Sequence, residues 1–128
     1  GKSKLETVFL TVTQEQMAAI MRDEGYAVDT DSGKIVWKID GMKALMLLGN
    51  DGESVQFYAA FADGNATLKK VNEWNKTKRY SRSYLDNDDD PCLELDLDLA
   101  GGVTLERIKD YLKTCRLSYQ SWVTEVVK

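Results

Sequence analysis

One segment near the end of the chain alternates leucine with acidic residues, and this alternation constrains the fold more than any other feature. Leucine occupies positions 93, 95, 97 and 99, whereas positions 94, 96 and 98 hold Glu, Asp and Asp. Successive side chains of a β-strand point to opposite faces of its sheet. The pattern therefore predicts a strand over residues 92–99. Its leucines face the core and its acidic side chains face water.

Further strands are predicted by alternating or continuous apolar residues bounded by turn residues. They are expected from Tyr26 and over residues 35–39, 42–48, 55–61 and 79–85. Three turns separate them: Asp40-Gly41, Gly49 to Gly52, and Asp86 to Pro91. Turns this short join antiparallel neighbours, so the strands form an antiparallel sheet.

Three helices are predicted by their capping residues. Thr13 and Gln16 form a capping box, and Gly25 suits the end of that first helix. Asn65 is the expected N-cap of a second helix that runs to about Lys76 or Lys78, with Leu68, Val71, Asn72 and Asn75 on one side and Trp74 at its margin. The third helix begins after Thr104. The fold class is therefore α+β, an antiparallel sheet with helices packed on it, in the order α-β-β-β-β-α-β-β-α.

The last helix has a long apolar stripe with spacings of three and four residues. Its members are Leu105, Ile108, Leu112, Cys115, Tyr119, Trp122 and Val126. Two interpretations remain open. The helix either packs on the sheet of its own protomer, which we favour, or pairs with another helix in a coiled coil.

Composition limits the classes of function. The 128 residues fit one domain, placed at residues 5–128, and residues 1–4 are interpreted as an expression scar or a disordered terminus. A net charge of −4 opposes binding to nucleic acid, and no apolar run is long enough to span a membrane. Cys92 and Cys115 belong to no Cys-x-x-Cys pair, so both are expected as reduced thiols in a cytoplasmic protein.

Catalytic residues are scarce. The chain has no histidine, which removes Ser-His-Asp and Cys-His catalysis and His-ligated zinc. No glycine-rich phosphate-binding motif is present. Asp86, Asp88 and Asp90 alternate like the start of a calcium loop, but Pro91 replaces the required glycine and Leu97 the required glutamate, so a solvated turn is favoured. We therefore predict no enzymatic activity, no cofactor and no metal site.

The most unusual segment is Val71-Asn72-Glu73-Trp74-Asn75, followed by a strand with Tyr80, Arg82 and Tyr84. Asparagine is unfavourable inside a helix, so two of them need partners. In one interpretation they bond the backbone of the neighbouring hairpin while Trp74 fills the core. In the other, Asn72, Trp74, Asn75, Tyr80, Arg82 and Tyr84 form a partner-binding surface. The hairpin register, which would decide whether Arg82 lies opposite Asp96, remains open.

This segment resembles the bacterial YbjN family, over roughly residues 13–128. The resemblance implies a type III secretion chaperone-like fold and a role in regulating sensory transduction. Secretion chaperones are small, acidic and often homodimeric, and they bind an extended partner along a groove or sheet edge.

The leading functional hypothesis is a non-catalytic protein-binding module, chaperone-like or regulatory, acting as a homodimer on an unidentified protein partner. The alternative is a sensor that binds a small ligand or metal between sheet and helices, with Cys115, Tyr119 or Trp122 lining the site. An enzyme that works with Asp, Glu and Tyr side chains is the third hypothesis.

Overall fold

The computed structural model describes residues 7–128 as an antiparallel sheet with helices on one face. The scar or disordered terminus expected at residues 1–4, and the predicted start of the domain at residue 5, lie outside these residues. In chain order the elements are β1 (Val8–Phe9), α1 (Gln14–Asp23), β2 (Ala27–Asp31), β3 (Lys34–Ile39), β4 (Met42–Leu48), β5 (Ser54–Ala60), α2 (Leu68–Thr77), β6 (Arg82–Leu85), β7 (Pro91–Asp98), β8 (Val103–Thr104), α3 (Leu105–Trp122) and the π-helical turn η1 (Val123–Val127).

The main sheet has six strands in the order β2-β3-β4-β5-β7-β6, with antiparallel pairing throughout. This confirms the predicted α+β fold and the order of its main elements. β2 is an edge strand. The pairing of β1 with β8 in a separate two-stranded sheet was not predicted, because two-residue strands carry no readable alternation.

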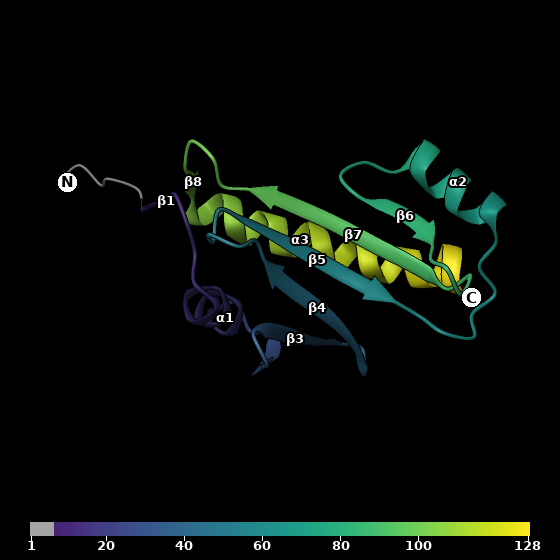
Figure 1. The fold of residues 1–128 in the computed structure, drawn as a ribbon, viewed down its shortest axis with the longest axis horizontal. Coiled ribbons are helices and arrows are strands. Elements are labelled where there is room, and N and C mark those ends of the chain that lie inside the picture. Colours follow the sequence, from purple (N-terminus) through teal and green to yellow (C-terminus); the bar gives the residue numbers. More distant parts are fainter. Residues whose placement is uncertain (1–6) are drawn as a thin grey trace.

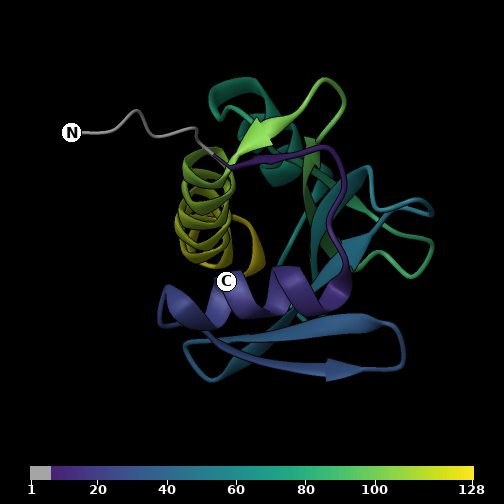
Figure 2. The same cartoon turned by 90° about the vertical axis from the view of Figure 1, so that its left-hand side faces the viewer.

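Helices α1 and α3 lie on the same side of the sheet, which bends around them (Figure 2). α3 runs along β5 and β7, whereas α2 lies outside, beside the edge strand β6 (Figure 1). The other face of the sheet has no helix against it in the described chain. The sheet therefore has a covered face, which holds the core, and an open face.

The capping box that was predicted to start α1 is present. The Thr13 hydroxyl accepts a hydrogen bond from the Gln16 N–H, and the Gln16 side chain accepts one from the Thr13 N–H. Gly25, just after the helix, has a φ of +89°, a conformation that only glycine adopts without strain. The predicted end of this helix is also confirmed.

The apolar stripe of α3 faces the core of its own protomer. Ile108, Leu112, Cys115, Tyr119 and Trp122 are buried, as is Val126 in the following turn. This confirms packing on the sheet and contradicts the coiled-coil interpretation. The α-helix ends at Trp122 and not at Val126, because the backbone changes to a π-helical turn over Val123–Val127.

Candidate partner-binding surface around α2 and β6

α2 is fixed against β6 by its tryptophan. Val71 and Trp74 are buried, and the Trp74 indole N–H donates to the Ser81 hydroxyl at 3.0 Å. The Lys78 ammonium lies 5.2 Å from the centre of the Trp74 ring, close enough for a cation–π interaction. Trp74 thus belongs to the packed side of α2, as the core interpretation predicted.

Asn75 pairs with the outer edge of β6. Its amide nitrogen donates to the Ser83 carbonyl at 2.9 Å, and its amide oxygen accepts from the Ser83 N–H at 2.9 Å. These are the two hydrogen bonds that another strand would make with Ser83. Because an unpaired strand edge invites association with other chains, Asn75 closes this part of the sheet edge. The interpretation that an asparagine bonds the neighbouring hairpin is confirmed for Asn75.

Two predictions for this helix were wrong. Asn65 is not the N-cap, because Thr67 takes that place and accepts a hydrogen bond from the Lys70 N–H. The helix consequently starts at Leu68, whose side chain is 72% exposed, and Asn72 is exposed too. Leu68 and Asn72 therefore do not lie on the packed side with Val71.

Ser83 is the buried polar centre of this region. Its hydroxyl donates to the Cys92 carbonyl at 2.7 Å and accepts from the Trp122 indole N–H at 2.9 Å. These two bonds connect β6 to β7 and to the end of α3. Sequence analysis missed Ser83, although it is the apolar-facing position between Arg82 and Tyr84.

Arg82 and Tyr84 lie on the open face, where they meet the acids of β7. Arg82 is directly opposite Glu94 in the register, and it forms ion pairs with Glu94 and, at 2.7 Å, with Asp96. The Tyr84 hydroxyl donates to the second carboxylate oxygen of Glu94 at 2.7 Å. The register that the sequence left open thus places Glu94, and not Asp96, directly opposite Arg82, and Arg82 reaches Asp96 as a diagonal neighbour.

Hydrogen bonding on the open face favours neutral tyrosines. The bond to Glu94 and desolvation raise the pKa of Tyr84. A contact at 3.6 Å with the Cys92 thiol, together with desolvation, raises the pKa of Tyr58 to about 12. The Arg82 guanidinium, bonded to Asp96, has a raised pKa and stays charged. At neutral pH the two tyrosines are therefore neutral, Arg82 is charged, and all three side chains bond to other residues of the open face.

Tyr80 lies apart from Arg82 and Tyr84, in the connection between α2 and β6. Its side chain is 78% exposed and its backbone has a φ of +72°, which is strained for an aromatic residue. It lines a groove of about 230 Å³ between β7 and α3, together with Leu95, Asp96, Leu97, Arg107, Asp110, Tyr111 and Thr114. The six predicted residues are thus divided among three places: the packed side of α2, the open face and this groove, with Asn72 outside all three.

The groove runs along an edge of β7 that no strand of the described chain covers. β6 pairs with Pro91–Glu94 only. The Leu99 N–H donates to the Glu53 carbonyl and the Phe61 N–H to the Pro91 carbonyl, so the odd-numbered residues of β7 bond toward β5. By alternation, the main-chain groups of Asp96 and Asp98 face the free edge.

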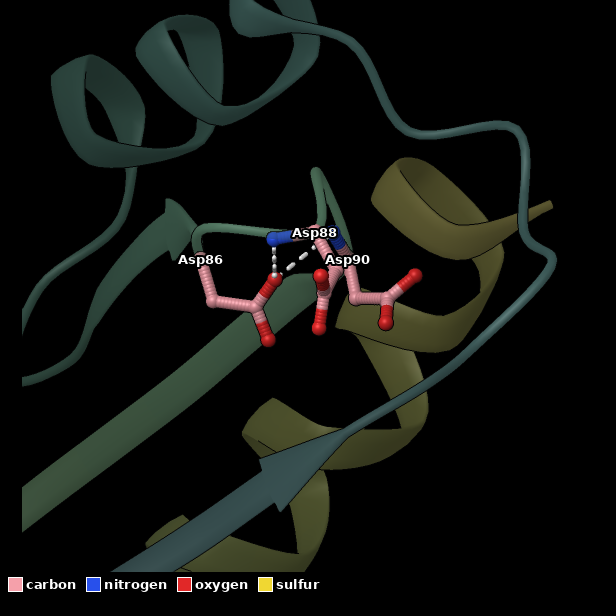
Figure 3. Close-up of side chains that lie close together, drawn as sticks. All are labelled: Asp86, Asp88 and Asp90. Atoms are coloured by element: carbon pink, nitrogen blue, oxygen red, sulfur yellow. Dashed lines mark hydrogen bonds between the residues drawn. The ribbon is translucent and has the colours of Figure 1, made fainter.

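The acidic turn gathers the carboxylates of Asp86, Asp88 and Asp90, whose nearest ligand oxygens lie within 4.8 Å of one another (Figure 3). One oxygen of Asp86 already accepts hydrogen bonds from the N–H groups of Asp88 and Asp90, at 2.9 and 3.0 Å. These bonds shape the turn before β7. The arrangement accounts for the aspartates as turn-forming residues.

Both cysteines are buried and unpaired, in agreement with the predicted free thiols. Burial raises the pKa of the Cys92 thiol and of the Cys115 thiol. A nucleophilic cysteine is activated by a lowered pKa, because the thiolate is the reactive form. Neither thiol is activated.

Among the described residues, no helix has both the length and the apolar character required to cross a bilayer.

These features define a small α+β protein whose sheet has one helix-covered face and one open face. The chain belongs to the YbjN family: the family model, described as "Putative bacterial sensory transduction regulator", matches residues 13–126. Among solved structures it is similar to YbjN from E. coli, entitled "a putative transcription regulator", with a TM-score of 0.69 and 12% identity over 95% of this chain and 99% of that one. None of the curated proteins compared with the chain matches it in sequence.

Proposed function

We propose that this chain is a non-catalytic protein-binding module, chaperone-like or regulatory, that acts as a homodimer and captures an extended segment of a protein partner. The observation that carries the proposal is the free edge of β7 beside the groove under Tyr80. A partner strand added there would bond the main-chain groups of Asp96 and Asp98. Its alternate side chains would enter the groove against Leu95 and Leu97.

Tyr80 supports this proposal because its conformation has no evident structural use. A strained backbone is retained where the surroundings or the function require it. Tyr80 places an exposed aromatic ring at the groove, and aromatic residues are enriched at the centres of interfaces. The absence of histidine from the sequence and the raised pKa of both thiols also favour binding over catalysis. The free thiols suit a reducing compartment, and we place the protein in the cytoplasm.

The test is a selection of random peptides on the immobilised protein, followed by affinity measurement on the Tyr80→Ser variant. We expect selected peptides to lose at least about tenfold in affinity for Y80S, a typical cost for an interface anchor. Asn72→Ala, which changes an exposed residue of α2 outside the groove, is the control. Amide shifts of Asp96 and Asp98 on peptide binding would place the peptide at the edge. Peptides that bind the native protein and Y80S with equal affinity would contradict the proposal.

A small-ligand sensor is the second candidate, and the observation that favours it concerns Tyr119. Its hydroxyl is buried and has no hydrogen-bond partner within residues 7–128. Tyr119 lines a cavity of about 360 Å³ with Asp40, Met42, Gln120, Val123, Thr124 and Lys128. Cys115 and Trp122 do not line it. A panel of small polar metabolites should then raise the melting temperature of the native protein but not of Tyr119→Phe.

A further inference from the structure

The open face of the sheet is divided by charge. The charged residues of β3 and β4 are all lysines, Lys34, Lys38 and Lys43, whereas those of β7 are Glu94, Asp96 and Asp98. β5, which lies between them, has no ionisable acid or base other than Tyr58. All six charged side chains alternate with residues of the covered face, so they share the open face. The inner strands thus carry lysines on the β3–β4 side and acids on the β7 side. The edge strands reverse these signs, with Asp29 and Asp31 on β2 and Arg82 on β6.

The β3–β4 side holds an unfavourable pair. Lys38 lies directly opposite Lys43 in the register of β3 and β4, and like charges in that position repel. Asp29 lies 3.5 Å from Lys38, but Lys43 has no ion-pair partner among residues 7–128. Lys43 is exposed and can therefore pair with a negative charge from outside the protomer.

The acidic turn lies at the same end of the open face, across the sheet from these lysines. In the register of Leu45 with Tyr58, Lys43 is level with Ala60, which pairs with Cys92. The Cys92 thiol lies 4.0 Å from the Asp86 carboxylate, where the turn begins. The lysine pair and the turn thus share one end but lie on opposite sides of the central strands.

A two-fold axis parallel to the strands, between β4 and β5, makes these charges complementary. It places β3 of one copy over β7 of the other, β2 over β6, and β4 over β5. Lys34 then meets the second copy's Asp96 beside the Arg82 that Asp96 already binds. Lys38 lies over the second copy's Cys92, where the acidic turn begins, and Lys43 lies next to it over Ala60. A two-fold axis in the interface but perpendicular to the strands would place each strand over itself, lysine on lysine and acid on acid.

The same axis covers the apolar part of the open face. Val36, Leu45, Leu47 and Tyr58 are half-buried, and no helix of the described chain lies over them. The axis brings Leu45 of one copy onto Tyr58 of the other. The sheet bends away around α1 and α3 (Figure 2), so these central strands make the first contact. An apolar centre with a charged rim is the usual anatomy of an interface.

We infer that the partner on the open face is a second copy of this chain, docked sheet to sheet about a two-fold axis parallel to the strands. This inference rests on the homodimer in the proposed function and makes no use of the groove under Tyr80. The two sheets pack in the aligned manner of a β-sandwich. The lysine pair and the acidic turn determine the direction of docking.

Charge reversal on each side tests the inference. We compare the native protein with K38E/K43E and with N87K/D88K, which change exposed residues of the lysine pair and of the turn. Mass is measured by sedimentation at increasing protein concentration. Each variant alone should dissociate at least about tenfold more readily than the native dimer, because both of its contacts become repulsive. An equimolar mixture should restore the dimer, because both contacts of the mixed pair are again attractive.

The control is K69E/K113E, which reverses two exposed lysines on α2 and α3, away from the open face. It should dimerise like the native protein. A native protein that stays monomeric, or a dimer that both reversals leave unchanged, would overturn the inference. Peptide binding in the groove is measured on K38E/K43E as well. If K38E/K43E loses the dimer but still binds the peptide, the two proposals are independent, and the failure of one does not imply the failure of the other.

Discussion

At the scale of single residues, the two asparagines of α2 make different contacts, although residues three positions apart lie on the same side of a helix. Both are exposed residues of α2, but only Asn75 bonds Ser83, through two hydrogen bonds. The difference arises from the position of β6, which reaches only one of the two side chains. The unusual signature therefore has a structural role at Asn75 and Trp74.

We expect Asn75→Ala to lower the free energy of unfolding by about 1 kcal/mol, because it removes two part-buried hydrogen bonds from the main chain of Ser83. Asn72→Ala should change it by no more than about 0.5 kcal/mol. Urea denaturation of both variants measures the two values. Equal effects would contradict the proposed closure of the β6 edge.

Tyrosine ionisation gives a second prediction at this scale. The pKa values of Tyr58 and Tyr119 are raised to about 12, and that of Tyr84 is raised too. Between pH 10 and 12 the unfolded chain loses these protons while the folded chain keeps them. The unfolded state then binds fewer protons, so stability falls as pH rises through this window and is fully retained below it. Tyrosinate absorbance and unfolding curves across the window measure both effects; unchanged stability would contradict the assignment.

At the scale of elements, a buried hydroxyl of α3 bonds two strands of the sheet. Tyr111 accepts a hydrogen bond from the Phe57 N–H at 3.0 Å and donates to the Leu95 carbonyl at 2.6 Å, so it joins the helix to β5 and β7. Burial raises the pKa of Tyr111, which keeps the donor proton in place. Two turns further on, the buried Tyr119 hydroxyl makes no such bond.

The two tyrosines of α3 form a matched pair for mutagenesis. Tyr111→Phe removes a buried hydroxyl that bonds the Phe57 N–H and the Leu95 carbonyl, and should cost about 0.5–1.5 kcal/mol of stability. Tyr119→Phe removes a hydroxyl that has no partner, so it should be neutral or stabilising. Thermal and urea unfolding measure both. A similar loss from the two variants would show that the Tyr111 bonds contribute nothing specific.

At the scale of the whole molecule, the three helices have different roles because of where they lie. α1 and α3 cover one face of the sheet and bury the core (Figure 2). α2 instead closes the edge at β6 and leaves the edge of β7 beyond Glu94 free. Among the described residues, the open face, the edge of β7 beyond Glu94 and the outer edge of β2 have no strand or helix paired with them. The dimer is proposed at the first of these places and the partner segment at the second.

The sequence by itself determined the main helices and strands and their order, because hydrophobic periodicity and capping are local. The alternation of Leu93 to Leu99 with acids, the capping box at Thr13 and the stripe of α3 each describe their own element. Only the tertiary structure decided which side chains meet. Three contacts join segments whose relative position no local pattern specifies: the Arg82–Glu94 register, the Asn75–Ser83 pair and the Tyr111 bridge. The same holds for the separation of Tyr80 from Tyr84. A shift of one residue in pairing turns every side chain of a strand to the other face, so such contacts depend on the folded whole.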